Sequence, residues 1–278
     1  MQSFFWILIT LVAGYLLIVL LMYLMQSSMV YHPQKQLTAT PAAAGLQYED
    51  ITFETEDEVQ LHGWYVPADS AEITVCYFHG NAGNISGRLE TLQLLNQLGL
   101  NVFIFDYRGY GRSEGSATEQ GTYSDAEAAW AYLQQERGLA DSEIIIMGRS
   151  LGGSIAAWLA ARKSAGAVVI ESTFTSAVDL GADLYPWLPV RQIMNFEYNT
   201  LAHIKEIDSP LFMAHSRDDR VVPYHHGQAL FEAANEPKQF LELRGSHGSG
   251  FWETGKTYRE GLRQFLEAHL PASKGFQK

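Results

Sequence analysis

Five short apolar runs, separated by helical patterns, constrain the fold of this chain more than any other feature. Each run is almost free of polar residues, as strands of a parallel sheet are when helices cover both faces. These runs are residues 73–78, 102–105, 144–147, 167–170 and 211–214. Two apolar helical stripes are Leu89, Leu92, Leu95 and Leu98, and Tyr258, Leu262, Phe265 and Leu266. Strands that alternate with helices predict an α/β fold with a mostly parallel central sheet flanked by helices.

Two further segments, residues 50–55 and 59–66, alternate apolar and polar residues around an acidic turn. This pattern predicts an antiparallel hairpin at a sheet edge. The length of 278 residues fits one large α/β domain with a short appendage. A formal net charge of −12 makes nucleic acid a poor partner.

The cysteine and histidine content bears on metals and cofactors. Cys76 is the single cysteine, so no intrachain disulfide or multi-cysteine metal site can form. The histidines lack HExxH-type spacing, and the adjacent His225 and His226 are not expected to face a shared ion on a helix. We therefore expect no metal held by the protein, and the function predicted below implies no cofactor.

The N-terminus carries an uncharged apolar run over residues 4–25. As a helix it would be about 33 Å long, enough to cross a bilayer core. A cleaved signal peptide is the alternative, but no Lys or Arg precedes the run and no A-x-A-like site follows it. We predict a transmembrane anchor over residues 1–26, a linker over 27–45 and a catalytic domain over 46–278.

The predicted anchor makes the protein a single-pass membrane protein. Lys35 is the only Lys or Arg between the span and Arg88, and it weakly favours a cytoplasmic catalytic domain. If residues 27–45 are only a linker, a shortened chain that begins near Thr40 should be soluble and active.

The segment Gly148-Arg-Ser150-Leu-Gly152 is a G-x-S-x-G motif between an apolar run and a helical stretch. In this context a serine occupies a sharp strand-to-helix turn, and flanking glycines avoid clashes there. The turn exposes the serine hydroxyl beside the N-terminus of a helix, where developing negative charge is stabilised. An ordinary glycine-rich turn is the alternative interpretation.

From about residue 46 onward, the chain resembles the α/β-hydrolases. Beyond the G-x-S-x-G motif, the stretches that carry this resemblance are 79–84 (HGNAGN), 106–115 (DYRGYGRSEG), 171–176, 215–223 and 245–247. They are similar to those of the bud-emergence-protein-like serine hydrolases and the depalmitoylating alpha/beta-hydrolase-domain proteins. Some members of that group also carry an N-terminal apolar anchor.

The resemblance implies a catalytic triad in the order Ser150, Asp219, His247. Ser150 would be the nucleophile, His247 the general base, and Asp219 the acid that orients the imidazole. Asp218 and Glu171 are alternative acids, and Asp218 is otherwise expected to cap its turn. The sequence departs from the family pattern after His247, where Gly248-Ser249 stands instead of Asn-Asp.

The fold also implies an oxyanion hole made of the backbone N–H groups of Asn81 and Leu151. The segment 172–209 is too long for a simple connection and is rich in apolar residues, which predicts a short cap over the site. The predicted function is a membrane-anchored serine hydrolase that cleaves carboxylic esters or thioesters through an acyl-enzyme. Its substrate would be a small-molecule or lipid-like acyl ester. A serine peptidase or amidase, or a non-catalytic binding protein, are the alternatives.

Overall fold

A mostly parallel eight-stranded sheet forms the centre of the molecule, in the order β10-β9-β8-β7-β4-β6-β3-β2. The computed structural model describes residues 1–270, so residues 271–278 of the predicted catalytic domain lie outside the described part. The strands are β2 (Glu49–Glu54), β3 (Gln60–Val66), β4 (Thr74–Phe78), β6 (Asn101–Phe105), β7 (Ile144–Arg149), β8 (Ala167–Glu171), β9 (Leu211–Ser216) and β10 (Lys238–Leu243). Only the β2–β3 and β3–β6 pairs are antiparallel. The predicted fold class and edge hairpin are confirmed.

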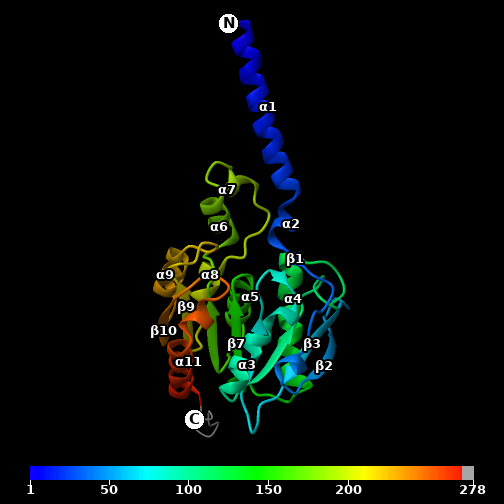
Figure 1. The fold of residues 1–278 in the computed structure, drawn as a ribbon, viewed down its shortest axis with the longest axis vertical. Helices are drawn as coiled ribbons and strands as arrows, with labels where there is room; N and C mark the ends of the chain where they lie inside the picture. Colours follow the sequence, from blue (N-terminus) through cyan, green and yellow to red (C-terminus); the bar gives the residue numbers. More distant parts are fainter. Residues whose placement is uncertain (271–278) are drawn as a thin grey trace.

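Helices cover both faces of this sheet (Figure 1). One face carries α4 (Glu119–Gln135), α5 (Leu151–Ala160), α8 (Thr200–Ile204) and α9 (Tyr224–Ala233). The other face carries α3 (Leu89–Gln97), α10 (Gly250–Thr254) and α11 (Lys256–His269). Three short 3-10 helices, η1 (Pro41–Ala44), η2 (Ile85–Arg88) and η3 (Asp141–Glu143), lie in connections.

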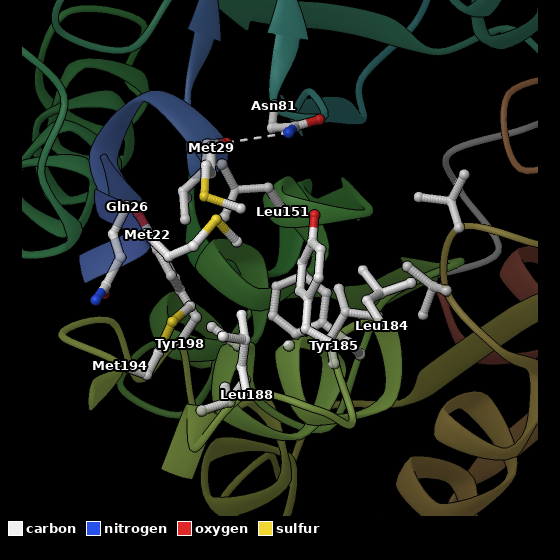
Figure 2. A pocket seen from close by; sticks show the side chains of 18 of the residues that line it. Met22, Gln26, Met29, Asn81, Leu151, Leu184, Tyr185, Leu188, Met194 and Tyr198 are labelled. Carbon is white, nitrogen blue, oxygen red and sulfur yellow. Dashed lines mark hydrogen bonds between the residues drawn. The ribbon is translucent and has the colours of Figure 1, made fainter. Parts of the chain in front are cut away.

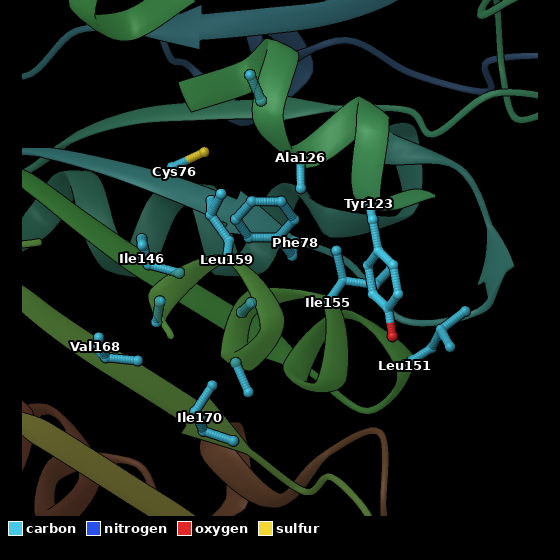
Figure 3. Packing of buried hydrophobic residues seen from close by; sticks show 14 of the residues in the cluster. Cys76, Phe78, Tyr123, Ala126, Ile146, Leu151, Ile155, Leu159, Val168 and Ile170 are labelled. Carbon is cyan, nitrogen blue, oxygen red and sulfur yellow. The ribbon is translucent and has the colours of Figure 1, made fainter. Parts of the chain in front are cut away.

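The apolar runs are continuous because each strand contributes to two cores. In β7, Ile144 and Ile146 pack into the core under α4 and α5, whereas Ile145 and Met147 pack into the core under α3 and α11. Figure 3 shows Ile146 among the strand and helix side chains of the first core. Truncating such a fully buried isoleucine to alanine typically costs about 2–5 kcal/mol. This double core fixes β7, and therefore the turn that follows it.

β10 was not among the predicted strands. It lies at the edge of the sheet and its residues are mostly half-buried. Its sequence, Lys-Gln-Phe-Leu-Glu-Leu, therefore lacks the continuous apolar run of the central strands.

The N-terminal helix α1 (Gln2–Leu24) extends away from the sheet and helices, and none of its residues is buried (Figure 1). Among residues 1–270, α1 is the helix long and apolar enough to cross a membrane, and a signal sequence would meet the same criteria.

The structure differs from the predicted linker. Residues 26–33 form α2 (Gln26–Val30) and β1 (His32–Pro33), and β1 pairs in parallel with β5 (Ala82–Gly83). Tyr31 is only 5% exposed. The proline- and alanine-rich composition that suggested a linker belongs to the residues further on, around η1.

The predicted cap is present but shorter than 172–209. Two helices, α6 (Ala177–Leu184) and α7 (Val190–Ile193), stand beside the end of α1 and α2 (Figure 1). α8 packs on α5 instead, because Ile204 and Ile207 are buried in the first core. We use "the cap" for residues 177–197.

Candidate active site

The turn between β7 and α5 holds Ser150 in a strained conformation. Its backbone has φ 55° and ψ −123°, a region that side-chain-bearing residues rarely adopt and that costs about 1–3 kcal/mol. A Cβ at Gly148 would lie 2.1 Å from the Gly152 carbonyl oxygen, and a Cβ at Gly152 would lie 2.1 Å from the Phe78 carbonyl oxygen. Both glycines are therefore sterically required by the tight turn, as the G-x-S-x-G motif predicts.

Ser150, His247 and Asp219 form a continuous chain of hydrogen bonds. His247 Nε2 lies 2.9 Å from Ser150 Oγ, and His247 Nδ1 lies 2.7 Å from Asp219 Oδ2. The three residues follow β7, β10 and β9, whose carboxyl ends meet at one edge of the parallel sheet. The sheet thus brings together residues that are 97 and 28 positions apart in the chain.

Asp219 is held as a carboxylate at the far end of this chain. Burial alone would raise its pKa, but the hydrogen bond from His247 and the N–H groups of Val221 and Val222 outweigh burial and lower the pKa. Its Oδ1 accepts those N–H groups at 2.9 and 2.8 Å. A carboxylate can only accept hydrogen bonds, so Nδ1 of His247 carries a proton and Nε2 presents its lone pair to the Ser150 hydroxyl.

The other two candidate acids lie away from His247. Glu171 is buried, and its carboxylate accepts hydrogen bonds from Arg149 Nε at 2.8 Å and from the Tyr258 hydroxyl. Asp218 is exposed, and it is the side chain of Asp219 that caps the turn. Of the three candidates, Asp219 contacts His247.

His215 supports Asp219 from behind, a role the sequence analysis did not assign. Its Nε2 donates to the Val222 carbonyl at 2.9 Å and lies 3.5 Å from Asp219 Oδ2. Burial lowers the His215 pKa, and the hydrogen bond to Val222 only partly offsets this. His215 is therefore neutral near pH 7 and adds no charge beside the carboxylate.

The two predicted oxyanion residues line the pocket that contains Ser150. Leu151 is the first residue of α5, so its N–H has no carbonyl partner within the helix and lies at the positive end of the helix dipole. The Asn81 side chain is engaged elsewhere, because its Nδ2 donates to the Val30 carbonyl at 3.0 Å (Figure 2). The loop of Asn81 runs close to the serine: a Cβ at Gly80 would lie 3.6 Å from the Ser150 Cβ.

A cavity of about 260 Å³ opens above Ser150, between two apolar walls (Figure 2). The N-terminal segment forms one wall with Met22, Gln26, Met29 and Val30. The cap forms the other, chiefly with Leu180, Leu184, Tyr185, Leu188, Ile193 and Met194. Among the described residues that line the cavity, none is Asp, Glu, Lys, Arg or His. The sequence analysis anticipated the cap wall and missed the N-terminal wall.

Polar contacts fix the N-terminal wall to the rest of the site. The Gln26 amide donates to the Ile193 carbonyl at 2.7 Å and accepts from the Asn195 N–H at 2.8 Å. The Tyr31 and Tyr198 hydroxyls are 2.7 Å apart. The sequence signal that could have revealed this N-terminal wall is a lone glutamine, Gln26, at the end of a long apolar run.

A second polar cluster lies where the cap meets α9. Contrary to the expectation from sequence, His225 and His226 are stacked and both direct Nε2 at Asp183, at 2.9 and 3.3 Å. These three residues place potential metal ligands within 4.8 Å of one another. However, His226 Nδ1 accepts the Thr175 N–H at 3.2 Å, so the proton lies on Nε2. With the proton there, His226 Nε2 has no lone pair to offer a metal ion, and it lies 3.3 Å from Asp183 Oδ2 without forming a hydrogen bond.

Comparison with known proteins identifies the family. A family model described as alpha/beta hydrolase fold matches residues 73–195. The chain is 34% identical over 276 residues to the alpha/beta hydrolase domain-containing protein WAV2 of Arabidopsis thaliana, covering 90% of each chain. It is 33% identical over 254 residues to an uncharacterized protein of Mycobacterium tuberculosis, again covering 90% of each. The protein belongs to the α/β-hydrolase family.

Solved structures show the same fold. An esterase of Pyrococcus furiosus matches with a TM-score of 0.73 at 21% identity, covering 87% of this chain and 98% of that one. An acylaminoacyl peptidase of Pyrococcus horikoshii matches with a TM-score of 0.63 at 18% identity, covering 88% of this chain and 45% of that one. These two structures share the α/β-hydrolase fold with this chain.

Proposed function

We propose that the protein is a membrane-anchored serine hydrolase that cleaves carboxylic esters or thioesters through an acyl-enzyme. The observation that carries this proposal is the hydrogen-bonded chain Ser150–His247–Asp219 at the base of an apolar cavity. Serine, histidine and carboxylate in this geometry form the arrangement that activates a hydroxyl for acyl transfer.

In the acylation step, Ser150 Oγ attacks the carbonyl carbon of the substrate and its proton passes to His247 Nε2. Negative charge develops on the carbonyl oxygen, where the backbone N–H groups of Leu151 and Asn81 would stabilise it. The intermediate then collapses, and the departing alcohol or thiol takes the proton from His247. The acyl group remains on Ser150.

In the deacylation step, a water molecule attacks the acyl carbon and gives a proton to His247. Collapse of this second intermediate releases the carboxylic acid, and His247 returns the proton to Ser150. Asp219 remains ionised throughout and stabilises the imidazolium. The sum of the two steps is ester plus water to acid plus alcohol, or thioester plus water to acid plus thiol.

The cavity favours an ester or thioester over a peptide. No charged side chain among its described lining residues could bind a peptide terminus or a charged side chain. Apolar walls instead suit the hydrocarbon part of an acyl group. The likeness to a peptidase keeps amide hydrolysis as the second candidate, because one triad serves all acyl transfers.

The proposed domain organisation follows from the exposure of α1. This helix of 23 residues has no charge and no buried residue, so protein leaves most of its apolar surface uncovered. We propose that residues 1–26 form a single membrane anchor and that residues from 46 onward form the catalytic domain. Residues 26–33 connect the two as part of the active-site wall.

Labelling with a fluorophosphonate probe tests the proposed nucleophile. The full-length protein should react, Ser150→Ala should not, and Ser164→Ala, which changes an exposed serine after α5, should react normally. A panel of p-nitrophenyl esters, a matched thioester and an aminoacyl p-nitroanilide then separates the two candidate reactions. Faster turnover of the anilide than of every ester would favour the peptidase alternative.

A further inference from the structure

We propose that the cavity receives its substrate from the lipid leaflet that surrounds α1, so that the substrate is a long-chain acyl ester dissolved in the bilayer. This inference rests on the proposed hydrolase function and on the proposed anchor. It goes beyond them by naming the source and the class of the acyl group.

The cap contacts the middle of the anchor helix. The Tyr15 hydroxyl donates to the Trp187 carbonyl at 3.0 Å, and Trp187 lies between α6 and α7 at the tip of the cap. Figure 1 shows the cap standing beside the end of α1 that is nearest the catalytic domain. The tip of the cap is therefore at the same level along α1 as Tyr15.

Exposed apolar surface continues along α1 past Tyr15 toward the catalytic domain. The side chains that show it are 48–68% exposed: Leu16, Leu17, Leu20, Leu21 and Leu24. In a membrane-spanning helix such side chains lie in the hydrocarbon core of the bilayer. The hydrocarbon core around α1 therefore extends past the level of Tyr15 and of the cap tip.

The tip of the cap has the amino-acid composition expected of a segment that lies at the membrane boundary. Residues 184–190, Leu-Tyr-Pro-Trp-Leu-Pro-Val, carry no charge. Leu184 is 45% exposed and Trp187 is 54% exposed. Tryptophan and tyrosine favour the boundary between hydrocarbon and headgroups. Close to this tip, Arg191 forms an ion pair with Asp179, and the Asp183 carboxylate lies 2.9 Å from His225 Nε2.

The cavity connects this boundary with Ser150. Met22 lies between the exposed Leu21 and Leu24 on α1 and also lines the cavity, opposite the exposed Leu184 of the cap (Figure 2). The Gln26 amide and the Asn81 Nδ2 group in its walls are hydrogen-bonded to backbone atoms, and apolar side chains line the passage between α1 and α6. An alkyl chain is the occupant that matches these walls, and it would reach the serine without passing through water.

Fluorescence quenching tests where the cap lies. Cys76 is buried, so a cysteine placed at position 187 can be labelled selectively with an environment-sensitive thiol fluorophore. The matched control is position 252, because Trp252 is 57% exposed and lies on α10, which packs on β10 and α11. The full-length Trp187→Cys and Trp252→Cys proteins are placed in phosphatidylcholine vesicles with nitroxide on the acyl chains.

The label at 187 should be quenched by the lipid nitroxide and protected from iodide in the water. The label at 252 should show the reverse pattern. Equal exposure of both labels to iodide would overturn the proposal. This measurement does not depend on activity, so it is informative even if the proposed hydrolase function fails.

Turnover in the same vesicles tests the source of the substrate. 4-Methylumbelliferyl palmitate is dissolved in the bilayer, and 4-methylumbelliferyl butyrate is supplied from the water as a measure of catalysis. Trp187→Asp should lower palmitate turnover at least tenfold and leave butyrate turnover within about twofold, whereas Trp252→Asp should change neither.

Equal loss of both activities, or no loss in Trp187→Asp, would contradict entry from the leaflet. Absence of turnover of both esters in the unaltered protein would instead count against the proposed hydrolase function. The two failures are thereby distinguishable.

Discussion

The two sides of the cavity are built in different ways. The polar side, Ser150 with His247 and Asp219, stands on loops that follow β7, β10 and β9. The apolar side consists of helices at the periphery, α1 and α2 from the N-terminus and α6 and α7 from the cap. The polar side requires defined residues at defined positions, whereas the apolar side requires only hydrocarbon of suitable shape.

This difference separates reaction from selection. In the proposed mechanism, the strained turn at Ser150 and the buried Asp219 would serve any acyl transfer. The apolar walls would select which acyl group reaches the serine. Substitutions on the polar side should therefore lower the turnover of every ester, whereas substitutions on the apolar side should affect the turnover of some acyl groups more than others.

The largest effect is expected at the centre of the polar side. Ser150→Ala removes the proposed nucleophile, so turnover of every ester should fall by about 10⁶, the scale of triad knockouts in another serine hydrolase. Stopped assays with purified protein measure this fall in turnover. Active-site titration of the unaltered enzyme calibrates the concentration of active sites. Residual turnover within a hundredfold of normal would show that another group attacks the substrate.

The next effect is expected at the acid. Asp219→Asn removes the acceptor that fixes the His247 tautomer and stabilises the imidazolium, and turnover should fall by about 10⁴. Asp218→Asn changes an exposed neighbour and should stay within about tenfold, or 1.4 kcal/mol of barrier. Both variants are assayed on one activated ester, with circular dichroism to check folding. The reverse ranking would refute the assignment of Asp219.

The polar side and the sheet could be predicted from the sequence because each has a local signature. Buried strands give uninterrupted apolar runs, and the turn at Ser150 needs glycine at 148 and 152 for steric reasons. The family resemblance favoured Asp219 over the adjacent Asp218 as the acid, and in the structure Asp219 contacts His247.

The apolar side could not be predicted in the same way. Met22, Met29 and Leu184 are ordinary hydrophobic residues, and nothing in their spacing shows that they face one another across a cavity. The same holds for β1, a two-residue strand whose partner is about 50 positions away. Contacts of this kind depend on the tertiary fold, so the sequence suggested a linker where the structure has a wall of the site.

A pair of shortened chains tests that wall directly. A chain that begins at Gln26 keeps α2, Tyr31 and β1, whereas one that begins at Thr40 loses them. The first should hydrolyse a short soluble ester within about threefold of the full-length rate. The second should lose at least tenfold, because it leaves Tyr198 without its Tyr31 partner and exposes the cap interior.

Thermal unfolding of the two shortened chains provides the control for this comparison. Burial of one large apolar side chain is worth about 1.5–3 kcal/mol, so the loss of Tyr31 alone should lower the unfolding midpoint by several degrees. If the chain beginning at Thr40 is as stable and as active as the one beginning at Gln26, residues 26–39 are a linker after all.

The smallest predicted effect is a pH dependence that both sides share. His215 lies behind Asp219 on the polar side, and His226 lies under the cap on the apolar side. Burial lowers the pKa of both, supplemented at His226 by the neighbouring His225 and partly offset at His215 by Val222. In the unfolded chain each would titrate near 6.5, so the unfolded state binds more protons below that pH. The stability that neutral histidines contribute is therefore present above pH 6.5 and is lost as the pH falls toward the folded pKa values. We expect the free energy of unfolding to decrease from pH 7 to pH 5, by up to about 1.4 kcal/mol per pH unit for each histidine.

Urea unfolding at several pH values across this range measures how the free energy of unfolding changes with pH. His226→Gln keeps a polar group against Thr175 and removes the titration, so it should flatten the slope, whereas replacing the exposed His32 by glutamine should leave it unchanged. A slope identical in all three proteins would mean that the acid sensitivity arises at other groups. The Asp219 carboxylate would not be one of them, because its pKa is lowered from 3.8 and its contribution is lost only below the range from pH 7 to pH 5.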